Sequence, residues 1–176
     1  QQKHNDKIYG LNILGDIYRS FELAEKYGVS FIQIDSVCGH LEPDLDEEYE
    51  SMLKFLRRNS DCTVLGGVRF KYQPVNSERT LAEDLKIGMG RCDAVVCTGE
   101  GTGLATPMDK VEKFKQILGD FPVIIGAGVT IDMVEACRRN SDGVIVGSWF
   151  KDNHRAEYSV NEDNVKYFML RWNAHT

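Results

Sequence analysis

The sequence predicts a fold of the (β/α)8-barrel type, present here as an incomplete barrel with about six parallel strands. Short apolar runs alternate six times with longer amphipathic segments, which is the pattern of parallel strands joined by helical crossovers. The 176 residues divided among six units give about 29 residues per unit, close to the roughly 30 of a complete barrel. No Gly-x-Gly-x-x-Gly turn follows the first run, which argues against the alternative, an open doubly wound sheet.

The expected strands are rich in β-branched and apolar residues and end in glycine or polar residues. They cover residues 9–14, 31–35, 63–70, 94–97, 122–125 and 143–146. Amphipathic patterns predict helices over residues 16–27 and 46–58, from Ser77 or Thr80 to Met89, and after Pro107, Thr130 and Asn161. Without a linker or a shift in composition, residues 1–176 are predicted to form a single domain.

Composition narrows the class of protein. Hydrophobic residues make up 42% and charged residues 27%, with a net charge of −6 and no basic stripe, so nucleic acid is not an expected partner. No apolar run reaches the roughly 20 residues of a membrane span, and no secretory signal opens the chain, so we expect a cytoplasmic protein without membrane insertion. The five cysteines lack CxxC spacing and no histidine pair has metal spacing, so no metal or cofactor is expected.

Two glycine-containing turns at the ends of the last two strands predict a phosphate site. Gly126 and Gly128 follow one strand, and Gly147 and Ser148 follow the next. In barrels, the loops after strands seven and eight often bind phosphate through backbone N–H groups and a short helix N-terminus. Glycine allows the backbone to approach an anion closely. The alternative is that these glycines only make tight turns.

A second glycine-rich loop follows the strand at 94–97. Thr98, Gly99, Gly101 and Thr102 offer amides and hydroxyls for a carbonyl, a hydroxyl or a second phosphate, and the alternative is a flexible turn. Asn12, at the end of the first strand, is expected to point inward as a ligand-binding residue.

The candidate catalytic residues are Lys71, Arg69 and Asp35. Strand alternation predicts that Arg69 and Lys71 point to the same side, where two unpaired cations would be costly to bury. They therefore imply an anionic substrate or an acidic partner, for which Asp35 and Glu100 are the candidates. Lys71 could act as a general acid or form an imine, and the alternative is a structural ion pair.

The assembled motifs resemble those of the BtpA/SgcQ family of barrel proteins, whose bacterial members are described as factors for photosystem I assembly or membrane-complex biogenesis. The resemblance covers nearly the whole chain and is most specific in segments 93–103, 126–130 and 142–151. The family's Asp-Val-x-x-Lys-His motif reads here from Gly67 to Tyr72 and keeps only the valine and Lys71. The family's arginine and asparagine on the preceding strand are Gln33 and Asp35 here.

The resemblance also implies that this chain supplies family strands three to eight and lacks two preceding β/α units. Exposed strand edges invite pairing, so a homo-oligomer or a fragment of a longer chain is expected. The expected function is binding of a phosphorylated small molecule, a sugar phosphate or a nucleotide-like compound, by a protein descended from an isomerase, lyase or nucleosidase-type enzyme. The alternative is a non-catalytic assembly factor that acts through protein partners.

Overall fold

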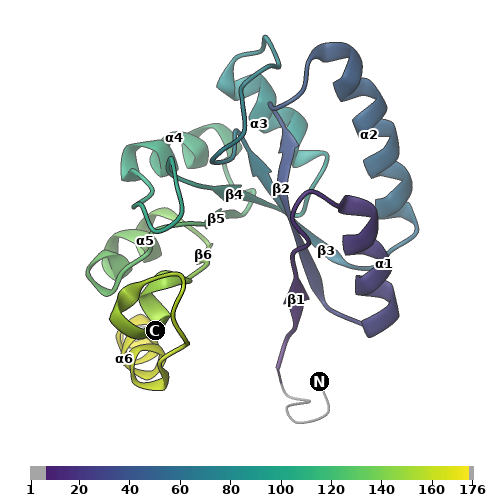
Figure 1. The fold of residues 1–176 in the computed structure, drawn as a ribbon. Helices are drawn as coiled ribbons and strands as arrows, with labels where there is room; N and C mark the ends of the chain where they lie inside the picture. The colour runs from purple at the N-terminus through teal and green to yellow at the C-terminus, as the bar shows by residue number, and fades with distance from the viewer. Residues whose placement is uncertain (1–6, 175–176) are drawn as a thin grey trace. The chain divides into compact units, whose positions relative to one another are not determined.

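The computed structural model describes residues 7–174, in which strands and helices alternate as the sequence predicts (Figure 1). The elements, in chain order, are β1 (Gly10–Leu11), α1 (Ile17–Tyr27), β2 (Phe31–Cys38), α2 (Pro43–Arg58), β3 (Thr63–Val68), α3 (Leu81–Met89), β4 (Ala94–Cys97), α4 (Met108–Leu118), β5 (Val123–Ile125), η1 (Ile131–Met133), α5 (Val134–Asn140), β6 (Gly143–Val144), η2 (Ser148–Phe150), η3 (Asp152–His154) and α6 (Glu162–Asn173).

The strands follow one another in the sheet in chain order, β1-β2-β3-β4-β5-β6. The pairs β1–β2, β2–β3 and β5–β6 are parallel. An open doubly wound sheet reverses its strand order at a switch point, whereas a barrel is wound in one direction. The order therefore fits the predicted barrel type and not the doubly wound alternative.

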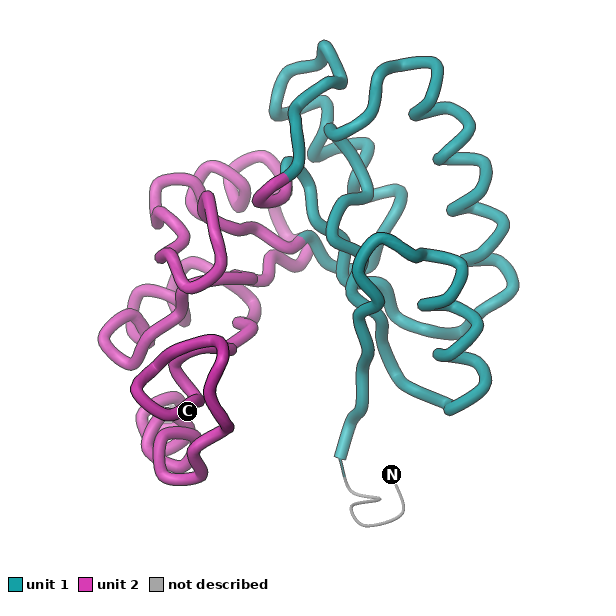
Figure 2. The backbone as a smooth tube through the Cα atoms, viewed as in Figure 1, with its two compact units in different colours: residues 1–69, 73–95 teal, residues 70–72, 96–176 magenta. Residues whose placement is uncertain are grey.

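The chain consists of two compact units, each described by itself (Figure 2). Unit 1 contains residues 1–69 and 73–95, and unit 2 contains residues 70–72 and 96–176. The three residues 70–72 thus belong to unit 2, although the residues on both sides of them belong to unit 1.

In unit 1, helices α1 and α3 pack against β2, and alternate residues of that strand are buried. Ile32 and Ile34 are fully or almost fully buried, whereas Gln33 and Asp35 on the opposite face are half-buried. Side chains of successive residues in a strand point to opposite faces, so one face of β2 forms the core of unit 1 and the other carries polar groups.

Helix ends in unit 1 follow the predicted signals. The Asp16 carboxylate accepts from the Arg19 N–H at 2.8 Å, and Thr80 and Glu83 form a reciprocal capping box. Gly28 ends α1 in the left-handed conformation. Helix α2 begins three residues earlier than predicted because Pro43, whose missing N–H costs nothing in the first turn, stands there.

A network of buried ion pairs joins α2, α3 and the loop before α3. Asp84, fully buried, accepts hydrogen bonds from Arg69 Nε at 2.8 Å and Arg79 Nε at 2.9 Å. Asp46, also buried, accepts from Arg79 at 2.8 Å and from Arg91 at 2.7 Å. Each of these two buried carboxylates therefore has two guanidinium partners, so the network pairs the buried charges of Asp46 and Asp84.

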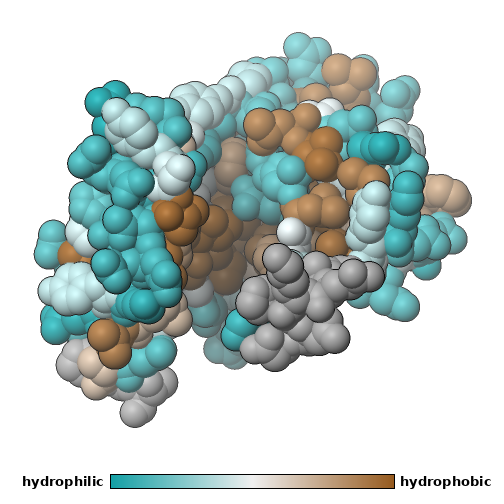
Figure 3. Space-filling model, turned by 60° about the horizontal axis from the view of Figure 1, so that its bottom comes forward, coloured by the Kyte–Doolittle hydropathy of each residue, from teal (hydrophilic) through white to brown (hydrophobic). Residues whose placement is uncertain are grey.

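In unit 2, α4 packs on β5 and α5, and α5 packs on β6 and α6. Phe114, Val123, Ile125 and Phe168 are among its buried residues. Figure 3 shows one face of the molecule, on which hydrophobic (brown) and hydrophilic (teal) residues are interspersed. Within residues 7–174 no helix has both the length and the apolar character needed to cross a membrane.

Candidate functional site

Lys71 lies in unit 2 beside the loop that follows β4. Its backbone N–H donates to the hydroxyl of Thr98 at 2.9 Å, and its ammonium donates to the hydroxyl of Thr102 at 3.2 Å. Within residues 7–174 the Lys71 ammonium forms no ion pair with a carboxylate. Among the described residues, the ammonium contacts the Thr102 hydroxyl and lies near the aromatic rings of Phe70 and Tyr72.

Tyr72 contacts the same loop and was not among the residues predicted from the sequence. Its phenol oxygen accepts the backbone N–H of Thr102 at 2.6 Å. This hydrogen bond, with a smaller contribution from the charge of Lys71, lowers the pKa of the Tyr72 phenol below its ordinary value. The sequence signals for Tyr72 were its position directly after Lys71 and its place at the histidine position of the Asp-Val-x-x-Lys-His motif.

The backbone around Lys71 is strained. Arg69 and Tyr72 have φ angles of 48° and 62°, in the left-handed region that residues other than glycine rarely adopt. Such conformations persist where the surrounding structure fixes them, and they occur often at functional sites. The pair of left-handed residues sets the position of Lys71 between them.

The loop 98–106 is fixed within unit 2 by buried hydrogen bonds. The Gly99 N–H donates to the Thr106 hydroxyl at 3.1 Å, and this hydroxyl donates to the carbonyl of Ala127 at 2.9 Å. The Lys110 ammonium also binds the Thr98 carbonyl at 2.6 Å. The loop is therefore held against the turn after β5, which explains its threonines better than a flexible turn does.

The two glycines after β5 have packing roles. The Gly126 N–H donates to the Cys97 carbonyl at 2.8 Å. The sequence predicted that this amide binds phosphate, but it is already used in this hydrogen bond. Gly128 has a φ of +65°, and a Cβ there would lie 2.0 Å from the carbonyl oxygen of Leu104. Both glycines are needed for close packing, although the Gly128 N–H has no acceptor in the described part of the chain.

Gly147 and Ser148 lie at the second predicted turn. A Cβ on Gly147 would meet no atom within 4 Å, and a Cβ on Gly103 would lie 3.6 Å from the Ser148 hydroxyl oxygen. This hydroxyl has no hydrogen-bond partner among residues 7–174. The helix after this turn is a 3-10 helix of three residues.

Gly101, in the loop after β4, is buried, and a Cβ there would lie 3.0 Å from the Tyr72 phenol oxygen.

Three of the predicted site residues belong to unit 1, namely Asn12, Asp35 and Arg69. The Asn12 amide donates to the Asp35 carboxylate at 3.0 Å, so these two predicted residues are brought together. Arg69 does not pair with Asp35 or Glu100, as predicted, but with Asp84 on α3. The strand β3 ends at Val68, and the left-handed Arg69 breaks the alternation on which the prediction rested.

The arrangement in unit 2 has the chemistry of an anion site. The Lys71 ammonium contacts the Thr102 hydroxyl. Among residues 7–174 the ammonium has no carboxylate partner, and the Ser148 hydroxyl and the N–H groups of Gly128 and Gly147 have no hydrogen-bond partner. Charged donors and backbone amides are the groups that bind phosphate in proteins. No group of three or more His, Cys, Asp or Glu residues in the described ranges is placed to hold a metal ion.

Several known proteins are similar to this chain. An uncharacterised protein of Thermococcus kodakarensis is 28% identical over 162 residues, covering 89% of this chain and 62% of the relative. An uncharacterised protein of Methanocaldococcus jannaschii is 26% identical over 164 residues, with the same two coverages. The chain thus spans about three fifths of the length of these relatives. The tryptophan synthase alpha chain of Streptococcus mutans is 30% identical over 129 residues, 73% of this chain and 49% of the relative.

Among solved structures, phosphoribosyl anthranilate isomerase from Thermococcus kodakaraensis superimposes with a TM-score of 0.58. The two sequences are 19% identical, and the similarity covers 93% of this chain and 72% of the isomerase chain. Together with the strand order, this similarity confirms the barrel-type fold. The family model of the BtpA family matches residues 6–174, and the chain therefore belongs to the BtpA family.

Proposed function

We propose that unit 2 binds the phosphate group of a small phosphorylated molecule. The observation that carries this proposal is the Lys71 ammonium, which has no acidic partner in residues 7–174 and lies 3.2 Å from the Thr102 hydroxyl. A cation held in place without a counter-ion favours binding of an anion. Phosphate would be bound by Lys71, Thr102, Ser148 and the N–H groups of Gly128 and Gly147.

The similar proteins support a ligand of this class. Phosphoribosyl anthranilate isomerase, as its name says, acts on a phosphoribosyl compound, and its fold is similar to that of this chain. Barrels of this type often bind phosphate at the loops after their last strands. A shared fold does not give a shared reaction, so the proposal rests on the donor groups of unit 2.

A catalytic role follows for Lys71 and Tyr72 if the phosphorylated molecule is a substrate. The ammonium would stabilise negative charge that develops next to the phosphate. The Tyr72 phenol, whose pKa the Thr102 N–H lowers, would exchange a proton with the reacting group. Arg69 is not included, because its guanidinium binds Asp84 and the carbonyl of Arg79.

Replacing Lys71 with methionine tests the phosphate site. A charge-assisted hydrogen bond contributes about 1.5–3 kcal/mol, so the variant should bind phosphate or ribose 5-phosphate roughly 10- to 100-fold more weakly. Isothermal titration calorimetry would measure the affinity, and the thermal shift caused by ligand would report it independently. Methionine keeps the apolar stem, which limits the effect on folding.

Lys113→Met is the matched control, since Lys113 is an exposed lysine on α4 of the same unit. It should leave the affinity unchanged. Equal affinities of Lys71→Met and the unmodified protein would contradict the assignment of Lys71.

The alternative is a non-catalytic assembly factor acting through protein partners. Exposed apolar residues on α6 favour a protein-binding surface, since Tyr167 and Leu170 are 64% and 71% exposed. In that case neither phosphate nor phosphorylated sugars and nucleotides would raise the melting temperature, which separates it from the anion-binding proposal.

A further inference from the structure

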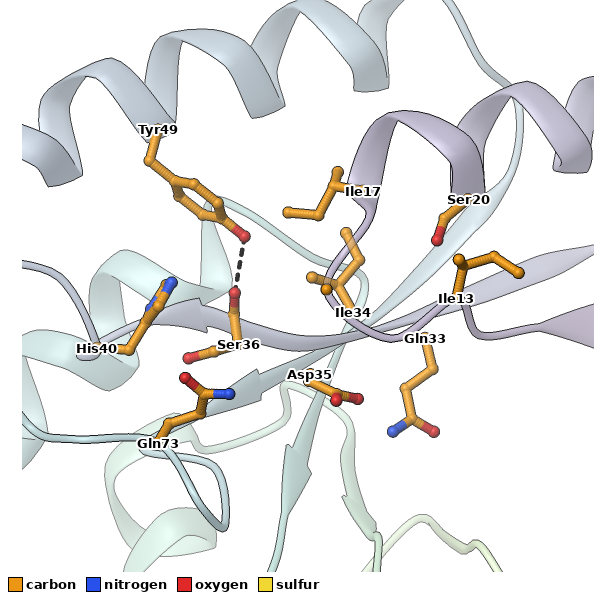
Figure 4. A pocket seen from close by; sticks show the side chains of 11 residues that line it. Ile13, Ile17, Ser20, Gln33, Ile34, Asp35, Ser36, His40, Tyr49 and Gln73 are labelled. Atoms are coloured by element: carbon orange, nitrogen blue, oxygen red, sulfur yellow. Dashed lines mark hydrogen bonds between the residues drawn. The ribbon is translucent and has the colours of Figure 1, made fainter.

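Unit 1 contains a cavity of about 240 Å³ at the edge of β2 (Figure 4). The cavity forms because β1 pairs with β2 over two residues only, Gly10 with Phe31 and Leu11 with Ile32. After Leu11 the chain leaves the strand, and β2 continues to Cys38 without that neighbour. The space beside residues 33–36 is therefore bounded by the loop before α1, by α1 and by α2.

The cavity has an apolar wall and a polar rim. Ile13, Ile17 and Ile34 provide the wall. Figure 4 shows Gln33 and Asp35 projecting from the face of β2 that is opposite to α1 and α2. The Gln33 amide has no hydrogen-bond partner within residues 7–174, whereas the Asp35 carboxylate accepts only from Asn12.

Three further polar groups lie at the other end of the cavity. The Tyr49 phenol donates to the backbone carbonyl of Ser36 at 2.7 Å, in place of a strand neighbour (Figure 4). The His40 ring lies edge-on to Tyr49, and its Nδ1 is buried without a partner among the described residues. Burial lowers the pKa of His40, so the ring is neutral near pH 7. The Gln73 amide is also unpaired within residues 7–174.

Buried and half-buried polar groups in folded proteins normally have partners. The half-buried Gln33 carboxamide has no partner among residues 7–174, and the exposed Gln73 carboxamide belongs to the same lining, so one occupant of the cavity can bind both. The lining contains the carboxylate of Asp35 and neither lysine nor arginine, so an anion is disfavoured. A drug-sized site has roughly 300–1,000 Å³, and this smaller cavity fits a single ring.

We infer that this cavity binds a neutral one-ring molecule that both donates and accepts hydrogen bonds, with Gln33 and Gln73 as its hydrogen-bond partners. Carboxamides combine both roles in one group, and the isoleucines provide an apolar surface for the face of the ring. A nucleobase and a pentose share this chemistry. The inference rests on unit 1 alone and does not depend on the phosphate site of unit 2.

The test is titration of the full chain with adenine, uracil and ribose, followed by NMR chemical shifts and calorimetry. We expect saturable binding of at least one of them, with shifts confined to residues of the cavity. Binding of the bases alone would identify a planar nitrogen heterocycle as the ligand class, and binding of ribose alone would identify a ring that carries hydroxyl groups. If none of the three binds at millimolar concentration, the inference is wrong.

Gln33→Leu and Gln73→Leu each remove one pair of hydrogen-bonding groups and should weaken binding about tenfold. Gln116→Leu, an exposed glutamine of α4, should have no effect. Gln73 is exposed in a loop, so its variant remains informative if Gln33→Leu fails to fold, which circular dichroism would reveal. If both variants fold and each binds the one-ring molecule as tightly as the unmodified protein does, the assignment of Gln33 and Gln73 as its partners is wrong. Inorganic phosphate should not compete, which separates this site from that of unit 2.

Discussion

Replacing Asp84 with alanine is expected to lower the free energy of unfolding by about 3–5 kcal/mol, because it leaves buried guanidinium charge without its carboxylate. Asp84 is fully buried and accepts from Arg69 Nε and Arg79 Nε. Removing one member of such a pair costs more than the pair itself contributes. Urea unfolding followed by circular dichroism measures the change. Asp61→Ala, an exposed aspartate of the same unit, should change the free energy by less than about 0.5 kcal/mol.

The same carboxylate contributes to acid sensitivity. Burial alone would raise the pKa of Asp84, but the hydrogen bonds from Arg79 and Arg69 outweigh it and hold the pKa below its ordinary 3.8. Its stabilising effect is therefore present above pH 3.8 and is lost as the pH falls through the lower folded-state pKa. Asp84→Ala should flatten this part of the stability profile. An unchanged urea midpoint and an unchanged acid slope in the variant would contradict the network.

Replacing Gly128 with valine is expected to destabilise unit 2 by roughly 2–5 kcal/mol. A side chain at a φ of +65° costs about 1–2 kcal/mol, and overpacking typically costs about 1–3 kcal/mol more. The clash is with backbone, since the new Cβ would lie 2.0 Å from the Leu104 carbonyl oxygen. Backbone cannot rotate away as a side chain can, so the loop 98–106 would have to move. Thermal unfolding measures the loss.

Gly147→Ala is the control for the valine variant, because nothing lies within 4 Å of its added Cβ. It should unfold at nearly the temperature of the unmodified protein. If Gly128→Val is as stable as Gly147→Ala, then the packing described for Gly128 is wrong. A stable Gly128→Val that loses phosphate binding would instead show that this glycine serves the ligand alone.

The order and type of the elements could be predicted from the sequence because each strand is a short apolar run and three helices begin at a side-chain cap. Asp16, Thr80 and Asn161 all cap the helices they were expected to begin. Strand ends were less predictable. Arg69 leaves the extended conformation at a position where alternation continued in the sequence, and only tertiary contacts to Asp84 explain this.

The candidate site was predicted less completely than the fold. Lys71 and Thr102 are in contact, and Asn12 binds Asp35, but the role of each glycine depends on backbone approach that spacing does not reveal. Gly126 uses its N–H in a bond to Cys97, and Tyr72 joins the site through its phenol. Both facts depend on which atoms the folded loops bring within hydrogen-bonding distance.

The three-residue excursion 70–72 has a consequence for how this protein can be divided. A gene segment that encodes residues 96–176 would supply the threonine loop and Ser148 as one continuous piece, yet it would omit the ammonium of Lys71. Duplication or transfer of that segment alone would therefore copy the hydroxyl groups of the anion site without its charge. Inheritance of the proposed activity requires both halves of the gene.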